Sequence, residues 1–315
     1  MQVEKAWVRL TVLAAVTAIG VVGGGLLLMR NGVYGLALFM TTPLILGAVA
    51  ECFRKSATGG RAARVGALTV LVANCALLVL GLEGVICIVM AIPLTVPLGA
   101  LGGYFAYVAG HARAKSDGTA AFLLLLPLSA GTLGFDLSAK APTFEARTSI
   151  EIAASPQKVW KYVISFPDMA PPDEWLFKAG VAYPERVRIA GSGVGAVRFC
   201  DFSTGPFVEP IKIWEEPRLL QFSVIESPAS MRELTVYANV TPRHLRGYLI
   251  SRQGQFRLTT LANGHTLLVG TSWYQHGLWP SQYWRLWSDA IIHRIQLRVL
   301  THIRTLAEAD NTTVQ

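Results

Sequence analysis

Charged residues are scarce in this sequence, and the shortage is confined to its first half. Asp, Glu, Lys and Arg make up 15% of the 315 residues, whereas about 25% is usual for soluble domains. Residues 1–144 hold ten Lys or Arg and five Asp or Glu, a balance of +5. Residues 145–315 hold eighteen and fifteen, a balance of +3. The basic residues of the first half flank apolar segments, which favours membrane topology over nucleic-acid binding as the explanation.

Cysteine is also scarce, and the common catalytic and metal-binding motifs are missing. Cys52, Cys75 and Cys87 lie in or beside apolar segments, and Cys200 stands alone in the second half. None of them forms a C-x-x-C pair or has a histidine at metal-ligand spacing. The sequence also lacks a P-loop, a dinucleotide fingerprint, and the G-x-S-x-G and H-E-x-x-H patterns. We therefore predict no metal site and no cofactor.

Long apolar runs dominate residues 1–138. A helix needs about 20 apolar residues to cross a bilayer, and five segments reach or approach that length: 7–29, 34–50, 65–82, 85–110 and 119–135. The fifth is the shortest and contains Pro127. We predict an all-α transmembrane region of about five helices in a multi-pass protein of the cell membrane.

The basic residues predict how these spans are oriented. Lys5 and Arg9 precede the first span, Arg54 to Arg64 fill the loop after the second, and Arg113 and Lys115 follow the fourth. The positive-inside rule places these regions, and the N-terminus, in the cytoplasm. Five spans then put the C-terminal domain outside the cytoplasm, which we expect. If the fifth segment lies in the interface instead, the domain is cytoplasmic.

Residues 139–144 form a short linker, and 145–309 read as a soluble α+β domain followed by a tail at 310–315. Ser155 and Pro156 begin a short helix in the manner of an N-cap and first turn. A second short helix is expected at 174–179. A final helix over 281–309 has apolar residues at steps of three and four. Alternation and turn residues predict strands at 145–152, 183–190, 196–203, 208–215, 219–226, 248–261 and 266–275.

Three motifs carry a family resemblance: IEIAASPQKVW at 150–160, the GSGVG turn at 191–195 before VRF, and IWEEPRLL at 213–220. They resemble the START/Bet v 1-like (SRPBCC) superfamily, specifically its polyketide cyclase/dehydrase and lipid-transfer group, in a membrane-anchored bacterial form. The resemblance implies a helix-grip fold, in which an antiparallel sheet wraps a long C-terminal helix around an apolar cavity. It implies no single activity, because members include binders, carriers and cyclases.

Strand parity and helix spacing suggest which aromatic residues line such a cavity. The ligand-binding candidates are Phe199, Phe222, Phe256, Trp273 and Trp287, although aromatic stripes at this spacing are more often solid core. His244 is a further candidate. It lies in a long insertion, 227–247, and either binds a ligand or is an exposed loop histidine. Glu83 is similarly ambiguous, since a carboxylate at membrane depth is a functional candidate but one in an interfacial loop is not.

Three functions stay open. The preferred one is a membrane-anchored binder or carrier of an apolar ligand, lipid or polyketide-like, whose partners are the bilayer and a small molecule. The second is a cyclase or dehydratase, which needs an acid/base pair in the cavity. Its candidates are His244, Tyr237, Glu233, His276 and Asp201, the last pointing inward beside Phe199. The third is a structural or regulatory protein that binds a protein partner through the aromatic segment 279–287.

Overall fold

The computed structural model describes the chain except for residues 1, 113–118, 238–241, 246 and 313–315. The side chains of 2–10, 112, 119–126 and 311–312 also lie outside the description. The chain divides into two compact units. The helical unit comprises Met1–Lys140 together with Glu233–His244 and Leu278–Pro280. The sheet unit comprises Ala141–Arg232, Leu245–Gly277 and Ser281–Gln315.

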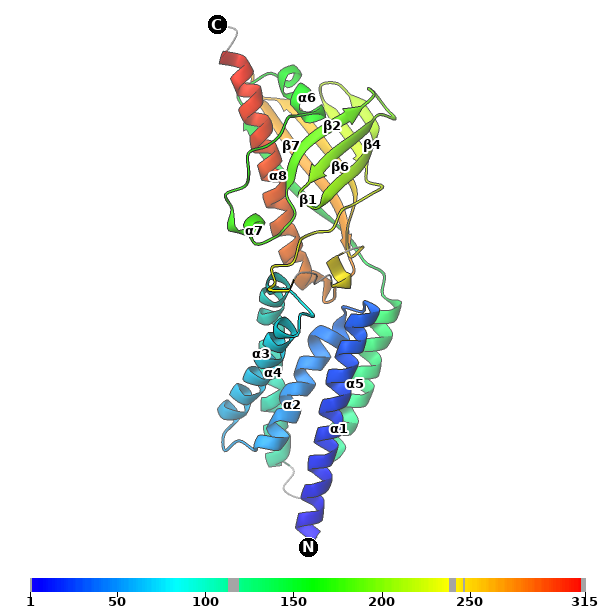
Figure 1. Cartoon of the computed structure of the whole chain (residues 1–315), viewed down its shortest axis with the longest axis vertical. Coiled ribbons are helices and arrows are strands. Elements are labelled where there is room, and N and C mark those ends of the chain that lie inside the picture. Colours follow the sequence, from blue (N-terminus) through cyan, green and yellow to red (C-terminus); the bar gives the residue numbers. More distant parts are fainter. Residues whose placement is uncertain (1, 113–118, 238–241, 246, 313–315) are drawn as a thin grey trace. The chain divides into compact units, whose positions relative to one another are not determined.

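The helical unit is built from α1 (Gln2–Asn31), a π-helical turn (Ala37–Thr41) that runs into α2 (Thr42–Arg54), α3 (Gly59–Val79), α4 (Val85–Ala112) and α5 (Thr119–Ser138) (Figure 1). Within the described residues, four segments are long and apolar enough to cross a membrane: Thr11–Asn31, Ala37–Arg54, Gly59–Val79 and Val85–His111. They correspond to the first four predicted spans. The fifth predicted span forms α5. Because the side chains at the start of this helix lie outside the description, its crossing of a membrane stays a prediction.

Glycines let α2, α3 and α4 pack closely. A Cβ atom added to Gly47 or to Gly66 would lie 2.0 Å from the carbonyl oxygen of Gly99 on α4. Small residues at such contacts allow helix backbones to approach, as is common in membrane proteins. The buried Asn74 side chain donates to Thr95 Oγ1 at 3.2 Å, so this polar group between α3 and α4 has a partner.

The sheet unit contains a seven-stranded antiparallel sheet with the order β1-β7-β6-β5-β4-β3-β2. Its strands are β1 (Thr143–Ile152), β2 (Pro184–Ala190), β3 (Val197–Phe202), β4 (Gly205–Glu215), β5 (Leu219–Ser223), β6 (Leu249–Thr260) and β7 (Thr266–His276). Two short helices, α6 (Pro156–Ile164) and α7 (Trp175–Lys178), follow β1, and α8 (Ser281–Thr312) ends the domain. The curled sheet and the long helix beside it (Figure 1) confirm the predicted helix-grip fold.

The helix α8 defines the inner face of the sheet. It packs on β1 and β7, and a Cβ atom added to Gly270 of β7 would lie 3.7 Å from Leu300 of α8. Leu300, Ile303 and Leu268 are fully buried. Strand residues with the parity of Gly270 therefore face the interior, and their neighbours face outward.

The insertion between β5 and β6 contains a segment that packs with the helical unit. We call this segment, Glu233–His244, the arm. The backbone N–H of Val85 donates to the carbonyl of Leu234 at 3.2 Å, and the Tyr237 hydroxyl donates to the carbonyl of Val79. The arm is thus held at the turn between α3 and α4. The sequence predicted a loop here but not its association with the membrane-type helices.

Candidate functional site: the inner face of the sheet

The inner face of β5 and β6 is lined by apolar and aromatic side chains. Phe222 of β5 and Phe256 of β6 both lie on it, with ring centroids 6.2 Å apart. Gly254, the cross-strand partner of Phe222, makes room for that ring, because a Cβ atom there would lie 2.5 Å from it. The structure therefore brings together two of the predicted ligand-binding residues.

A buried ion pair interrupts this apolar face. Arg198 of β3 and Glu209 of β4 are cross-strand neighbours, only 2% and 6% exposed, and the guanidinium Nη1 donates to the Glu209 carboxylate. The guanidinium also lies over the rings of Phe222 and Phe256, 5.2 and 5.4 Å from their centroids. Within the described residues, Arg198 Nε has no hydrogen-bond partner.

The surroundings of this pair determine its chemistry. Burial raises the pKa of Glu209, and the neighbouring Arg198 offsets only part of that shift. Arginine remains charged even when buried and donates in a planar fork that matches oxygen anions. An apolar interior that contains one guanidinium is suited to a ligand that is mostly apolar and carries a carboxylate or carbonyl oxygen. We had not predicted Arg198 or Glu209, since charged strand residues normally face water.

Two other reactive groups are near this interior. Cys200 lies on the inner face beside Arg198, and burial raises the pKa of its thiol to about 12. It therefore stays protonated and is a poor nucleophile. His302 of α8 packs edge-on against Phe166, 5.2 Å between centroids, and partial burial lowers its pKa. At neutral pH this imidazole is uncharged and able to accept a proton.

Phe199 and Trp273 were predicted to face the interior, but the structure places both on the outer face. Phe199 stacks beneath the exposed guanidinium of Arg188, 5.4 Å from its centroid. The Trp273 indole N–H donates to Glu145, an exposed carboxylate, at 3.0 Å. The error is one of parity: hydrophobicity alone favoured an inward Phe199, whereas its neighbours on β3 take the inner positions.

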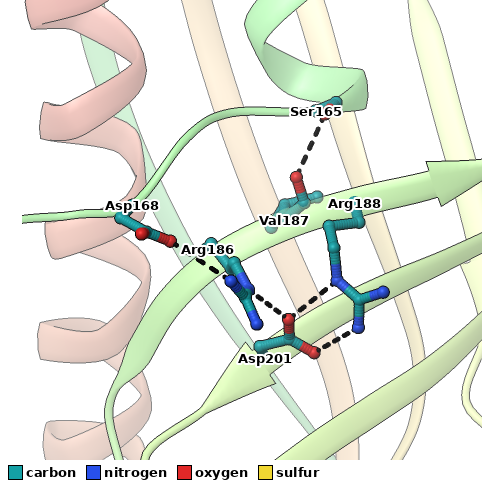
Figure 2. A network of polar contacts seen from close by, with 6 residues as sticks. All are labelled: Ser165, Asp168, Arg186, Val187, Arg188 and Asp201. Carbon is teal, nitrogen blue, oxygen red and sulfur yellow. Dashed lines mark hydrogen bonds and ion pairs between the residues drawn. The ribbon is translucent and has the colours of Figure 1, made fainter.

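Asp201 shares the parity of Phe199 and also faces outward (Figure 2). Its carboxylate accepts from Arg186 Nε at 2.7 Å and from Arg188 at 2.9 and 3.0 Å. Arg186 also pairs with Asp168 at 3.7 Å. The two arginines lower the pKa of Asp201 and keep it ionised. Its predicted position as an inward acid is therefore wrong, and it forms a surface ion-pair network.

The other predicted residues are dispersed. Trp287 is half-buried on α8. His276 is buried at the end of β7, stacked on Phe144 with centroids 4.9 Å apart. His244, Glu233 and Tyr237 lie on the arm, in the helical unit. The five acid/base candidates thus do not form one site.

The helical unit contains the one group of possible metal ligands found among the described residues. The ligand atoms of its four side chains lie within 4.8 Å of one another: Glu83, Cys87, Glu233 and His244. The sequence predicted no metal site, because these residues are up to 161 positions apart (244 minus 83) and match no local motif.

Comparison with known families identifies the sheet unit. Residues 143–274 match the family described as polyketide cyclase / dehydrase and lipid transport. This segment is similar to the members of that family. The match confirms the resemblance seen in the sequence motifs, and the fold is that of a hydrophobic ligand-binding domain. No curated protein matches the chain.

Several solved structures are similar to the sheet unit. A norcoclaurine synthase point mutant from Thalictrum flavum is 13% identical, with 55% of this chain and 99% of that chain covered and a TM-score of 0.35. The Zhui aromatase/cyclase from Streptomyces sp. R1128 is 16% identical, with 53% and 94% covered and a TM-score of 0.33. The Aha1 dimer from Colwellia psychrerythraea is 15% identical, with 52% and 96% covered and a TM-score of 0.30.

Proposed function

We propose that the protein is a membrane-anchored binder or carrier of an apolar molecule, lipid or polyketide-like, held between the inner face of the sheet and α8. The observation that carries this proposal is the aromatic inner face of β5 and β6 with the Arg198 guanidinium set into it. Phe222 and Phe256 would contact the apolar body of the ligand, and Arg198 would bind an oxygen at its polar end.

The helical unit supports the membrane part of the proposal. Among the residues that the structure describes, four apolar segments are long enough to cross a bilayer, and a tether of this kind keeps a binding domain close to a source of lipids. With α5 as a fifth span, the positive-inside rule places the domain outside the cytoplasm.

The full-length protein in nanodiscs is the material for the test. Native mass spectrometry identifies any apolar molecule that co-purifies, and a pyrene-labelled fatty acid measures affinity, with empty nanodiscs subtracted. We expect Phe222→Leu to weaken probe binding about tenfold, or about 1.4 kcal/mol, because it removes aromatic contact area.

Phe199→Leu is the matched control, since it makes the same change on the outer face of a nearby strand. It should leave affinity unchanged. The proposal is wrong if the wild-type protein binds neither a co-purified molecule nor the probe, or if the two variants weaken binding equally.

A cyclase or dehydratase is a second candidate, favoured by one observation. Burial raises the pKa of Glu209, which makes this carboxyl group, beside the Arg198 guanidinium, easier to protonate than an exposed one. Such a pair suits proton donation to a carbonyl oxygen during aldol closure or loss of water. Incubation with a short poly-β-ketoacyl thioester, followed by chromatography, tests for cyclised products. If this function holds, Glu209→Gln abolishes product formation while probe binding persists.

A further inference from the structure

A cluster of four side chains at the start of α4 serves neither the sheet interior nor the proposed ligand. Glu83 lies in the turn before α4, and Cys87 lies in the first turn of that helix. Glu233 and His244 come from the two ends of the arm. All four belong to the helical unit, so the arm brings the last two residues to the first two.

The donor atoms converge closely. The Cys87 thiol donates to Glu233 Oε1 at 2.9 Å, and its sulfur lies 3.0 Å from His244 Nε2. His244 Nδ1 lies 3.8 Å from Glu83 Oε1. A tetrahedral zinc site with metal–ligand bonds of about 2.0–2.3 Å has ligand atoms roughly 3.3–3.8 Å apart. One ligand atom from each of the four side chains lies within 4.8 Å of the others, so shifts of up to about 1 Å would bring the cluster into that geometry.

The buried atoms of the cluster also lack partners. Within the part of the chain that the structure describes, Glu83 Oε2, Glu233 Oε2 and His244 Nδ1 are buried without a hydrogen bond. The Glu83 residue is only 5% exposed. Buried polar atoms are almost always satisfied, so three orphans at one point indicate that a binding group belongs there.

The charges indicate a cation. Ionised Glu83 and Glu233 place two negative charges beside the Cys87 sulfur and the His244 imidazole. Among the described residues, His244, 3.8 Å from Glu83, is the one basic side chain that pairs with either carboxylate, so these charges lack a cation to balance them. A divalent metal supplies that charge, and a set of one sulfur, one nitrogen and two oxygens matches zinc rather than calcium or magnesium.

We propose that the helical unit binds one zinc ion through four side chains: Glu83, Cys87, Glu233 and His244. Four protein ligands leave no open position, which is the mark of a structural site. The metal holds the arm against the first turn of α4. Tyr34 orients two of the ligands, since its hydroxyl donates to Glu83 Oε1 at 3.2 Å and its ring meets His244 edge-on, with centroids 4.7 Å apart.

A Cys–His nucleophile is the competing explanation of the short Cys87–His244 contact. That chemistry needs a thiolate paired with an imidazolium. Here the thiol proton is directed at a carboxylate, and burial disfavours the charged imidazole, so the geometry suits metal coordination better.

The test uses the full-length protein, purified in detergent without a polyhistidine tag or chelator. Elemental analysis should find one zinc per chain. After removal of zinc by a chelator, cobalt(II) should bind at one equivalent and give the ultraviolet thiolate-to-cobalt charge-transfer band and the visible bands of tetrahedral coordination. Less than a tenth of an equivalent of either metal in the wild-type protein overturns the proposal.

Variants identify the ligands. Cys87→Ser should abolish the charge-transfer band, and His244→Gln should weaken zinc binding at least tenfold. Cys75→Ser and His111→Gln are matched controls, because both residues are exposed elsewhere in the helical unit, and both should keep full binding. A band that persists in Cys87→Ser overturns the site.

If a variant fails to fold, the proposal can still be tested, because zinc can be removed from the wild-type protein with a chelator and then added back. Limited proteolysis should cut the arm at least five times faster in the metal-free protein, and zinc should restore protection. Cleavage that is the same with and without zinc contradicts the role of the metal in holding the arm.

Discussion

At the scale of single residues, the buried Arg198–Glu209 pair is the most consequential feature of the sheet unit. Removing one member of a buried pair leaves the other charge uncompensated, which costs about 3–5 kcal/mol, whereas replacing both can be nearly neutral. The pair therefore does not argue for stability in itself. The position of the Arg198 guanidinium over the rings of Phe222 and Phe256 fits better with a role in binding.

Arg198→Met should lower the free energy of unfolding by about 3–5 kcal/mol at neutral pH. The loss should shrink as the pH falls. Without Arg198 the pKa of folded Glu209 rises further above its ordinary value, so the folded state binds the proton more tightly than the unfolded chain and stability falls as pH rises. Below about 4.5 Glu209 is protonated in both states and the cost disappears.

Thermal or denaturant unfolding across pH 4–8 checks this prediction. Arg198→Met combined with Glu209→Gln should recover most of the stability at neutral pH. Arg188→Met is the control, because Arg188 pairs with Asp201 on the exposed outer face, where an ion pair is worth at most about 1 kcal/mol. If Arg188→Met and Arg198→Met lower the free energy of unfolding equally, the buried position of Arg198 does not make its ion pair more important for stability.

At the scale of elements, strand and helix positions follow from the sequence within a few residues, because alternation, turn glycines and apolar helix spacing are local signals. The sequence does not determine in the same way which side of a strand faces the interior. On β3, Phe199 and Cys200 are both suitable for burial, and only the pairing of β3 with β4 decides between them. The arm was unpredictable for the same reason, since Glu233 and His244 find their neighbours through long-range contacts.

The packing of α8 against the sheet can be tested with one pair of substitutions. Leu300 is fully buried against Gly270, whereas Leu297 on the same helix is 41% exposed. Leu300→Ala should cost about 2–5 kcal/mol because it leaves a cavity, and Leu297→Ala should cost less than about 1 kcal/mol. Thermal unfolding of both variants measures the difference. Similar costs would mean that α8 does not pack through this face.

At the scale of the whole molecule, the distribution of basic residues predicts the side of the membrane on which the sheet unit lies. Cytoplasmic loops and the helix ends beside them are rich in Lys and Arg. Arg54 at the end of α2, Lys55 in the following loop, and Arg61 and Arg64 at the start of α3 form such a group. The turn between α3 and α4 lies at the other end of these helices and carries only Glu83. With α5 as a fifth span, we therefore predict that the sheet unit is extracytoplasmic.

A pair of reporter fusions after residue 315 tests this orientation. Alkaline phosphatase, which is active only outside the cytoplasm, should be active, and green fluorescent protein, which fluoresces only when folded inside, should be dark. Exchanging the four basic residues between positions 54 and 64 for serine should weaken the bias, since they are half of the basic residues predicted on the cytoplasmic side. The opposite reporter pattern would contradict this prediction. It would indicate that α5 does not cross the bilayer and that the sheet unit is cytoplasmic.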